Sequence, residues 1–447
     1  MKQDLTTGPI TRTLLWFALP MTLGNLLQQF YNIADTLIIG RFVGADALAA
    51  VGSSYTLMTF LTSILLGLSM GSGVAVSIAY GKKDMECLKE SVFLSFTGIA
   101  LAAVGISLVV FVGIDEILQL LQVPEQIRGL MKSYLLVIFA GIGGTFLYNY
   151  FSCILRSLGN SVVPLLFLGV SAGLNIVLDL LFVLGFGWGV WGAGLATSIA
   201  QWLSGIGLWL YAVILVPELR IERTFMRWNR KTAKNLCSLS MITSAQQSIM
   251  NFGILMVQGR VNYFGPAVMA AFAAAVKIDS FAYMPVQDFG NAFSTFIAQN
   301  YGARKEKQIC SGIRSAVCTS MLFGIFVSTL VWIFANPLMQ IFVGKEEVQI
   351  LQIGVQYLRI EGAFYCLIGL LFLLYGFFRA IEKPGMSVVL TVISLGLRVV
   401  LAYALSAIPA LGVTGIWVSI PIGWLIADLT GVIPLWRFYR KNGKRTE

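Results

Sequence analysis

The first polar side chains that could do chemistry lie inside a long apolar run, from Leu14 to Gly40. Gln28, Asn32 and Asp35 follow one another at helical spacings of four and three residues, so they share one face of a helix. A carboxylate at membrane depth costs about 2.5–3.5 kcal/mol on insertion scales, and lipid cannot satisfy it. We interpret Asp35 as a functional carboxylate; the alternative is a helix–helix hydrogen bond inside a bundle.

A second polar pair lies in the stretch SAGLNIVLDLLFVLGFG, where Asn175 and Asp179 are four residues apart and share a helix face. Two carboxylates on different helices, with an amide beside one of them, suit a cation or a proton. We expect Asp35 and Asp179 to form one shared site, because two intramembrane carboxylates are expensive to insert. The alternative is that each carboxylate makes a separate polar contact.

The second half of the chain carries a different ionic group, with two cations and two carboxylates in predicted membrane spans: Lys277, Asp279, Glu361 and Arg398. We expect the two cations to pair with the two carboxylates, since an unpaired buried charge is the costlier state. Whether this group is a structural network or part of a substrate site is left open. Asp288 and Asp428 lie near predicted span ends and are expected to be solvated.

The composition is that of a membrane protein. The chain has 447 residues, of which 57% are hydrophobic and 12% are charged, whereas soluble domains carry about 25% charged residues. It contains no histidine, which excludes histidine-based catalysis, histidine metal sites and histidine proton relays. Its six cysteines show neither CxxC pairing nor zinc spacing, so we expect reduced structural thiols.

Twelve apolar runs predict twelve membrane-spanning helices. The N-terminal sequence MKQDLTTGPITRT has no small-residue cleavage site, so no cleavable signal peptide is expected. The predicted spans cover about 14–39, 48–79, 92–114, 133–155, 162–184, 189–216, 236–258, 268–299, 315–336, 357–378, 386–408 and 413–436.

The basic residues predict how the chain is oriented. If the N-terminus is cytoplasmic, 23 of the 31 lysines and arginines fall in cytoplasmic segments and six fall in outer loops. This bias predicts a multi-pass protein of the cytoplasmic (inner) membrane with both termini in the cytoplasm. The net charge of +10 and the basic run Arg220–Lys234 follow the same rule, so no nucleic-acid partner is expected.

An internal repeat divides the chain into two halves, at shifts that grow from 219 to 223 residues. Its matched pairs include Gln28 with Gln247, Asn32 with Asn251, Tyr134 with Tyr357, and Gly189 with Gly412. Each half has six spans, so we predict an all-α integral membrane fold of two parallel six-helix repeats with a central cleft. The predicted parts are an N-lobe at 1–216, a cytoplasmic basic connector at 217–235 and a C-lobe at 236–447.

The two halves differ at three equivalent positions of the repeat, where polar residues of the first half are replaced in the second. The pairs are Asp35 with Ile254, Asn175 with Arg398, and Asp179 with Ala402. The candidate coupling chemistry of the first half therefore has no direct copy in the second.

Several stretches occur in a familiar order: ALPMTLGNLLQQFYNIADTLIIG, GADALAAVG at 44–52, LRSLGNSVVP at 155–164, NIVLDLLFVLGFGWGVWGAGLAT at 175–197 and TFIAQNYGA at 295–303. With these motifs and its plan of two times six spans, the chain resembles the multidrug and toxic compound extrusion (MATE) family over essentially its whole length. The resemblance implies an outward pump for amphipathic, often cationic organic compounds. Such a pump is driven by inward protons or sodium ions, and its two halves rock against each other.

The resemblance also implies a coupling site in the N-lobe. By the family's motif it falls on Asp35, Asn175 and Asp179, with Tyr134, Asn149 and Thr197 as neighbours. The expected coupling ion is a proton; sodium, as the alternative, would bind at Asp35, Asn175, Asp179 and Thr197. Some members use acidic residues of spans 7 and 10 instead. This chain has none in span 7, and Glu361 lies early in span 10, which favours the N-lobe.

Polar side chains expected as candidates to line the cleft are Gln28, Asn32, Gln247, Asn251, Lys277, Asp279, Glu361 and Arg398. An alternative function is a flippase of a lipid or lipid-linked saccharide, which would need several cations for phosphate, and only Lys277 and Arg398 qualify. An enzyme is not expected, because no HExxH, P-loop or GxSxG motif is present. The expected partners are small organic cations or amphipathic drugs and membrane lipid, with no cofactor and a monomeric chain.

Overall fold

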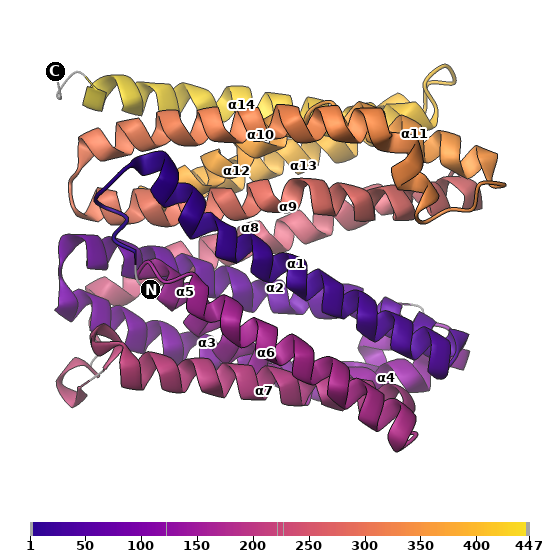
Figure 1. The fold of residues 1–447 in the computed structure, drawn as a ribbon, viewed down its shortest axis with the longest axis horizontal. Coiled ribbons are helices and arrows are strands. Elements are labelled where there is room, and N and C mark those ends of the chain that lie inside the picture. The colour runs from indigo at the N-terminus through magenta and orange to yellow at the C-terminus, as the bar shows by residue number, and fades with distance from the viewer. Residues whose placement is uncertain (1–2, 122, 221, 227, 444–447) are drawn as a thin grey trace. The chain divides into compact units, whose positions relative to one another are not determined.

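The computed structural model describes residues 3–121, 123–220, 222–226 and 228–443, and every regular element in these ranges is helical (Figure 1). The all-α prediction is therefore confirmed. The first half contains α1 (Ile10–Phe42), α2 (Ala45–Lys82), α3 (Met85–Leu120), α4 (Glu125–Ala140), α5 (Ile142–Ser157), α6 (Val162–Asp179), the π-helix η1 (Leu180–Gly185) and α7 (Gly189–Leu215).

The connector between the halves holds two short 3-10 turns, η2 (Pro217–Leu219) and η3 (Arg223–Phe225). Lys89 of α3 pairs with Glu222 of this connector at 3.2 Å and lies over the ring of Phe225. The second half contains α8 (Arg230–Asn262), α9 (Pro266–Gly302), α10 (Glu306–Gln340), α11 (Val348–Gly362), α12 (Tyr365–Ala380), α13 (Pro384–Ser406) and α14 (Val413–Gly443).

Two of the predicted spans are broken helices. The span predicted at 133–155 consists of α4 and α5, bent by 50°, and the span at 357–378 consists of α11 and α12, bent by 52°. Within the described residues, eight helices are long and apolar enough to cross a membrane. Counting each of the two bent pairs as one span raises this number to ten. The other two predicted spans are α1 and α8, at 33 residues each, which carry the amide side chains and Asp35.

The repeat is visible in the backbone as well as in the sequence. Left-handed turns occur at four pairs of equivalent residues: Gly44 with Gly265, Lys83 with Arg304, Gly159 with Glu382, and Gly189 with Gly412. At three of these eight positions a residue with a side chain takes the φ that favours glycine, so the turn geometry is kept even where the residue type is not. The two six-span halves therefore follow one chain path.

The chain forms two compact units that are divided within α1 and within α8. Unit 1 contains Gln3 and the segment Leu19–Ser244, and unit 2 contains Asp4–Ala18 and the chain from Ala245 onward. Side chains at the α9–α10 turn hold the N-terminal segment within unit 2. Asn300 Nδ2 donates to the carbonyl of Leu5 at 3.0 Å, and Lys305 Nζ donates to the carbonyl of Thr6 at 2.8 Å.

Each unit has its own helix packing. In unit 1, α5 packs on α2 and α7, and α7 also packs on α4 and α6. In unit 2, α9 packs on α10, α11 and α12, and α14 packs on α12 and α13. Both units are thus bundles in which polar side chains can be enclosed by helices on several sides.

A close helix contact within unit 1 joins α2 to the first half of α8. A Cβ atom added at Gly67 would lie 2.4 Å from Ser244 Cα, and one added at Gly71 would lie 2.5 Å from Ser240 Cα. The hydroxyls of Ser72 and Ser240 are 2.9 Å apart. Small residues four apart on both helices let the backbones meet, as in other packed membrane helices.

We predict that Gly71→Ala destabilises the protein by about 1–3 kcal/mol, because the new methyl group overlaps backbone atoms of α8 that have no room to yield. Thermal unfolding of the purified protein in detergent measures this. Gly52→Ala is the matched control on the same helix: nothing lies within 4 Å of its added Cβ, and alanine favours the helix by about 0.5–1 kcal/mol. Equal unfolding temperatures for the two variants would contradict the packing argument.

Candidate functional site

The structure brings Asp35 of α1 and Asp179 of α6 together inside unit 1. Their side chains are 9% and 0% exposed, and the two carboxyl groups interact directly. Two carboxylates accept hydrogen bonds and cannot donate them, so a hydrogen bond between them requires one to hold a proton. The pair therefore has the form of two acids that share a proton.

The oxygens of this pair find few donors in the described part of the protein. Both carboxylate oxygens of Asp179, Oδ1 of Asp35 and Oδ1 of Asn175 are buried without a hydrogen-bond donor. Buried oxygen atoms without donors are what a proton or a hard cation would bind. No three His, Cys, Asp or Glu side chains cluster in the described residues, so other ligands would be neutral oxygens.

An amide and a hydroxyl complete the site. Asn175 Nδ2 donates to Thr197 Oγ1 of α7 at 3.3 Å, which turns its carbonyl oxygen away from that hydroxyl. One helical turn earlier, the hydroxyl of Ser171 donates to the carbonyl of Ala200 at 3.0 Å. These two bonds fix how α6 and α7 face each other, so Asn175 and Asp179 are held on one helix face as their spacing predicts.

The helix carrying Asp179 changes its winding at that residue. α6 ends at Asp179 and continues as the π-helix Leu180–Gly185, with the amide of Phe186 bonded to the carbonyl of Leu181 at 2.9 Å. π-helical turns are rare and occur often at functional sites. The apolar sequence LLFVLG gives no sign of this change of winding.

Tyrosines surround the carboxyl pair. Tyr134 of α4 lies close enough to interact electrostatically with Asp35 and Asp179, as the family resemblance implies, and it is 3% exposed. Tyr31, one turn before Asp35 on α1, belongs to the same group and was missed in the sequence. Its spacing of four residues from Asp35 is the signal that could have found it.

The other residues predicted for this site or for a cleft are not among the groups seen to act on the carboxyls of the pair. Asn149 is half-buried and donates to the carbonyl of Thr145 on its own helix, at 3.0 Å. On α1, Gln28 is exposed and Asn32 is half-buried. On α8, Asn251 donates to the carbonyl of Gln247 at 3.3 Å. Of the predicted coupling residues, Asp35, Asp179 and Tyr134 act on one another. Asn175 is bonded to Thr197 one helical turn before Asp179, and Asn149 is not seen to join either set.

Unit 2 contains a second buried charged group, formed by Asp279 of α9, Glu361 of α11 and Arg398 of α13. The carboxyl groups of Asp279 and Glu361 interact directly, and the charge of Arg398 acts on both. Among the described residues, however, Arg398 makes no ion pair, and its Nε has no acceptor. The expected direct pairing of Arg398 is thus corrected to an interaction at longer range.

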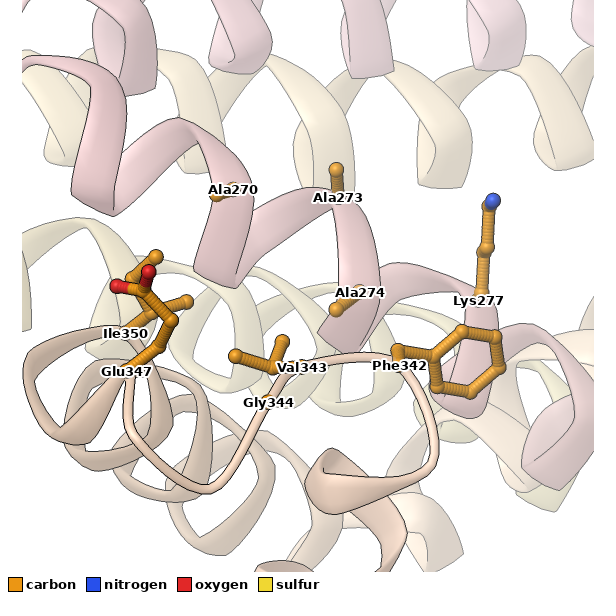
Figure 2. Close-up of a pocket in the computed structure, with 9 residues that line it drawn as sticks. All are labelled: Ala270, Ala273, Ala274, Lys277, Phe342, Val343, Gly344, Glu347 and Ile350. Carbon is orange, nitrogen blue, oxygen red and sulfur yellow. The ribbon is translucent and has the colours of Figure 1, made fainter.

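Lys277 does not join this group. It is exposed and lines a surface cavity of about 390 Å³ between α9 and the loop that precedes α11. Figure 2 shows Lys277 and Glu347 at opposite ends of a row of alanines, with Val343 and Gly344 lying across from that row. A flexible lysine avoids burial in this way, which corrects the expectation that it pairs with Asp279 or Glu361.

Two further carboxylates are buried where solvation was expected. Asp288 is 2% exposed and Asp428 is 3% exposed. Asp428 lies on α14 near Cys366 and Tyr375 of α12, and neither of its oxygens has a donor in the described structure. A position near a predicted span end did not indicate solvation here, because these helices continue, packed against other helices, beyond the predicted boundaries.

Comparisons with known proteins agree with one another. The model of the MatE family matches residues 20–181 and 240–404. A probable multidrug resistance protein of Bacillus subtilis, YpnP, is 29% identical over 95% of this chain and 94% of its own length. YoeA of the same organism, also named a probable multidrug resistance protein, is 27% identical over 96% and 94%.

The fold also matches solved structures. One is described as the outward-facing conformation of a multidrug resistance MATE family transporter of the MOP superfamily. It superposes with a TM-score of 0.92 at 22% identity, over 98% of both chains. At this identity the match establishes the fold, with its twelve membrane spans.

We predict that Asp179→Asn makes the stability of the protein less dependent on pH. Two buried carboxyls in contact are expected to share a proton that the unfolded chain releases, so we expect the stability of the wild type to fall as pH rises, by up to about 1.4 kcal/mol per pH unit for each such proton. The variant has only one carboxyl, so the fall should be shallower. Thermal unfolding between about pH 6 and pH 9 measures it.

The control for this experiment is Asp46→Asn, which removes an exposed carboxylate of α2. Its pH profile should match that of the wild type. A profile for Asp179→Asn that also matches the wild type would mean that Asp35 and Asp179 do not share a proton.

Proposed function

The chain belongs to the MatE family, and from this premise we propose that it exports amphipathic, often cationic organic compounds in exchange for an inward-moving cation. The names of the related Bacillus subtilis proteins support multidrug export as the activity. The observation that carries the coupling part of the proposal is the buried contact between Asp35 and Asp179. Among the described residues, no lysine or arginine is seen to act on this pair.

The charge of the pair gives the exchange its driving force. With one shared proton the pair still carries one negative charge, which an apolar surrounding disfavours strongly. A second cation neutralises it, so the loaded and empty proteins differ in charge at the same buried place. A ligand drives a conformational change only through such a difference in its affinity for the two states. Rocking of the two halves would then expose the site to either side of the membrane in turn.

We propose the proton as the coupling ion, with sodium as the alternative. Both fit the oxygens of Asp35, Asn175 and Asp179, with Thr197 beside them. The proton is favoured because a carboxyl pair that shares one proton can accept a second on the same oxygens, without further ligands. Tyr134 and Tyr31 supply hydroxyls next to the pair.

Several further expectations accompany this proposal. The positive-inside bias supports a multi-pass location in the cytoplasmic (inner) membrane with both termini in the cytoplasm, although Lys2, Arg227, Lys444 and Arg445 lie outside the described residues. We propose a monomer that needs no cofactor and makes no chemical change to its substrate. Gln28, Asn32, Gln247, Asn251 and Lys277 stay predictions as cleft-lining residues.

The alternative of a lipid flippase has little support. Of the two candidate phosphate-binding cations, Arg398 is buried and Lys277 is exposed at a surface cavity, so they do not form a joint site. The related proteins carry names of multidrug resistance, not of lipid transport.

We predict that wild-type protein in liposomes moves a fluorescent organic cation under an imposed proton or sodium gradient, and that Asp35→Asn lowers this rate at least about tenfold. The loss is expected because one ligand of the coupling cation is removed, and removing groups around a bound cation costs about 10–100-fold in affinity. Asp46→Asn is the control and should transport normally, since Asp46 is exposed on α2.

Full gradient-driven transport by Asp35→Asn would remove the coupling role from this pair. Transport of a labelled lipid headgroup without movement of the organic cation would favour the flippase instead.

A further inference from the structure

The second charged group, in unit 2, occupies the place in its repeat that the Asp35–Asp179 site occupies in unit 1. Two pairs of contacts establish the correspondence. In unit 1, Ser171 contacts Ala200; in unit 2, the equivalent Ser394 contacts Gly423, where an added Cβ would lie 2.4 Å from the Ser394 carbonyl oxygen. Helices α13 and α14 therefore meet in the same register as α6 and α7, and this places Arg398 at the position of Asn175.

The second correspondence concerns a tyrosine that each site has at the equivalent position of its repeat. In unit 1, a Cβ added at Gly194 would lie 3.2 Å from the ring of Tyr134. In unit 2, the equivalent residues are Trp417 and Tyr357, whose ring centroids are 4.9 Å apart. Tyr134 lies beside Asp35 and Asp179, and Tyr357 lies beside Glu361 and Asp279. One tyrosine thus marks the same location in both repeats.

The carboxyls reach this location from different helices in the two repeats. Asp279 and Glu361 correspond to Met58 and Ile138, which pack with Tyr134 in an apolar cluster of unit 1. Conversely, Asp179 corresponds to Ala402, which is fully buried and uncharged. The two sites are therefore not copies of one motif: each repeat has acquired its own carboxyl pair beside the common tyrosine.

The two sites differ in their protein-borne charge. In unit 1 the groups acting on Asp35 and Asp179 are each other and neutral side chains. In unit 2 the carboxyl contact between Asp279 and Glu361 also requires one proton, but the remaining negative charge faces the guanidinium of Arg398. With one proton, the group of Asp279, Glu361 and Arg398 has no net charge. With one proton, the pair of Asp35 and Asp179 still carries one negative charge.

Among the described residues, the other titratable groups that act on this cluster are tyrosines. They are Tyr283 of α9, Tyr357 of α11 and Tyr365 of α12. From α14 the described neighbour at Tyr357 is the ring of Trp417. Arg398 is 9% exposed. Its guanidinium is the positive charge that acts on the carboxyls of Asp279 and Glu361.

We propose that Arg398 is a built-in cation of the unit 2 site, which keeps an exchanged cation from binding there and confines ion loading to Asp35 and Asp179. Arg398 thus determines where the coupling cation binds. The proposal rests on the proposed function for the role of the unit 1 pair. It also explains why the position of an uncharged asparagine in one repeat holds an arginine in the other: a guanidinium cannot lose its charge, so it blocks the site permanently.

The test removes the unit 1 site first, so that unit 2 is observed alone. In an Asp35→Asn/Asp179→Asn background, Arg398→Asn installs the residue found at the equivalent position of unit 1, and Arg398→Lys keeps the positive charge. Binding of radioactive sodium to the purified proteins and their unfolding temperatures in sodium or choline chloride, over a range of pH, are then measured.

We expect Arg398→Asn to gain a cation that Arg398→Lys does not bind. The gain would appear as one additional bound sodium ion per chain, with a sodium-dependent rise in unfolding temperature, or as one additional proton, with stability that falls more steeply as pH rises. A purely structural role for Arg398 predicts lower stability without either cation response. Identical cation and pH responses in the two variants would overturn the proposal.

A further variant covers the case in which Arg398→Asn does not fold. Adding Asp279→Asn leaves Glu361 as the single carboxyl of the cluster, which is neutral when it holds one proton, so the combined variant should fold and should bind no sodium ion and no second proton. Failure of the combined variant to fold would also overturn the proposal, because it would show that charge balance is not what Arg398 supplies. None of these measurements uses transport, so their outcome is separate from the outcome of the export experiment.

Discussion

Two carboxyl groups in contact inside an apolar helix bundle cannot both stay ionised unless a cation joins them. The Asp35–Asp179 pair is under this constraint, and no lysine or arginine in the described part of the chain is seen to act on it. We propose that a proton or sodium ion from solution supplies the missing positive charge. The surrounding structure fits this need, since α7 orients Asn175 through Thr197 and the π-helix begins directly after Asp179.

The internal repeat lets one scaffold carry two charge arrangements. The backbone turns match pair by pair, and Tyr134 and Tyr357 lie at the same place in each unit. The side chains around these tyrosines then diverge, so that one site has two carboxyls acted on by neutral described groups and the other contains Arg398. Under the proposal for Arg398, such an arrangement would couple transport through one half of a duplicated fold.

The sequence predicted what depends on spacing and on the cost of burial. Asn175 and Asp179 could be assigned to one site because they are four residues apart. Asp35 could be assigned to a site because an intramembrane carboxylate is costly to insert without a function. The π-helix after Asp179 and the burial of Asp428 could not be predicted, since both depend on how neighbouring helices pack. The long-range relation of Arg398 to its carboxylates was missed because spacing along the chain says nothing about distance between helices.

The most direct test of the account is whether binding of an organic cation displaces an ion from the Asp35–Asp179 pair, since linkage between two ligands is reciprocal. Calorimetry of this binding in buffers of different ionisation enthalpy, together with sodium release, gives the number of ions displaced. The account predicts release of a proton or a sodium ion by the wild type and none by Asp35→Asn/Asp179→Asn. Equal release by both proteins would contradict it.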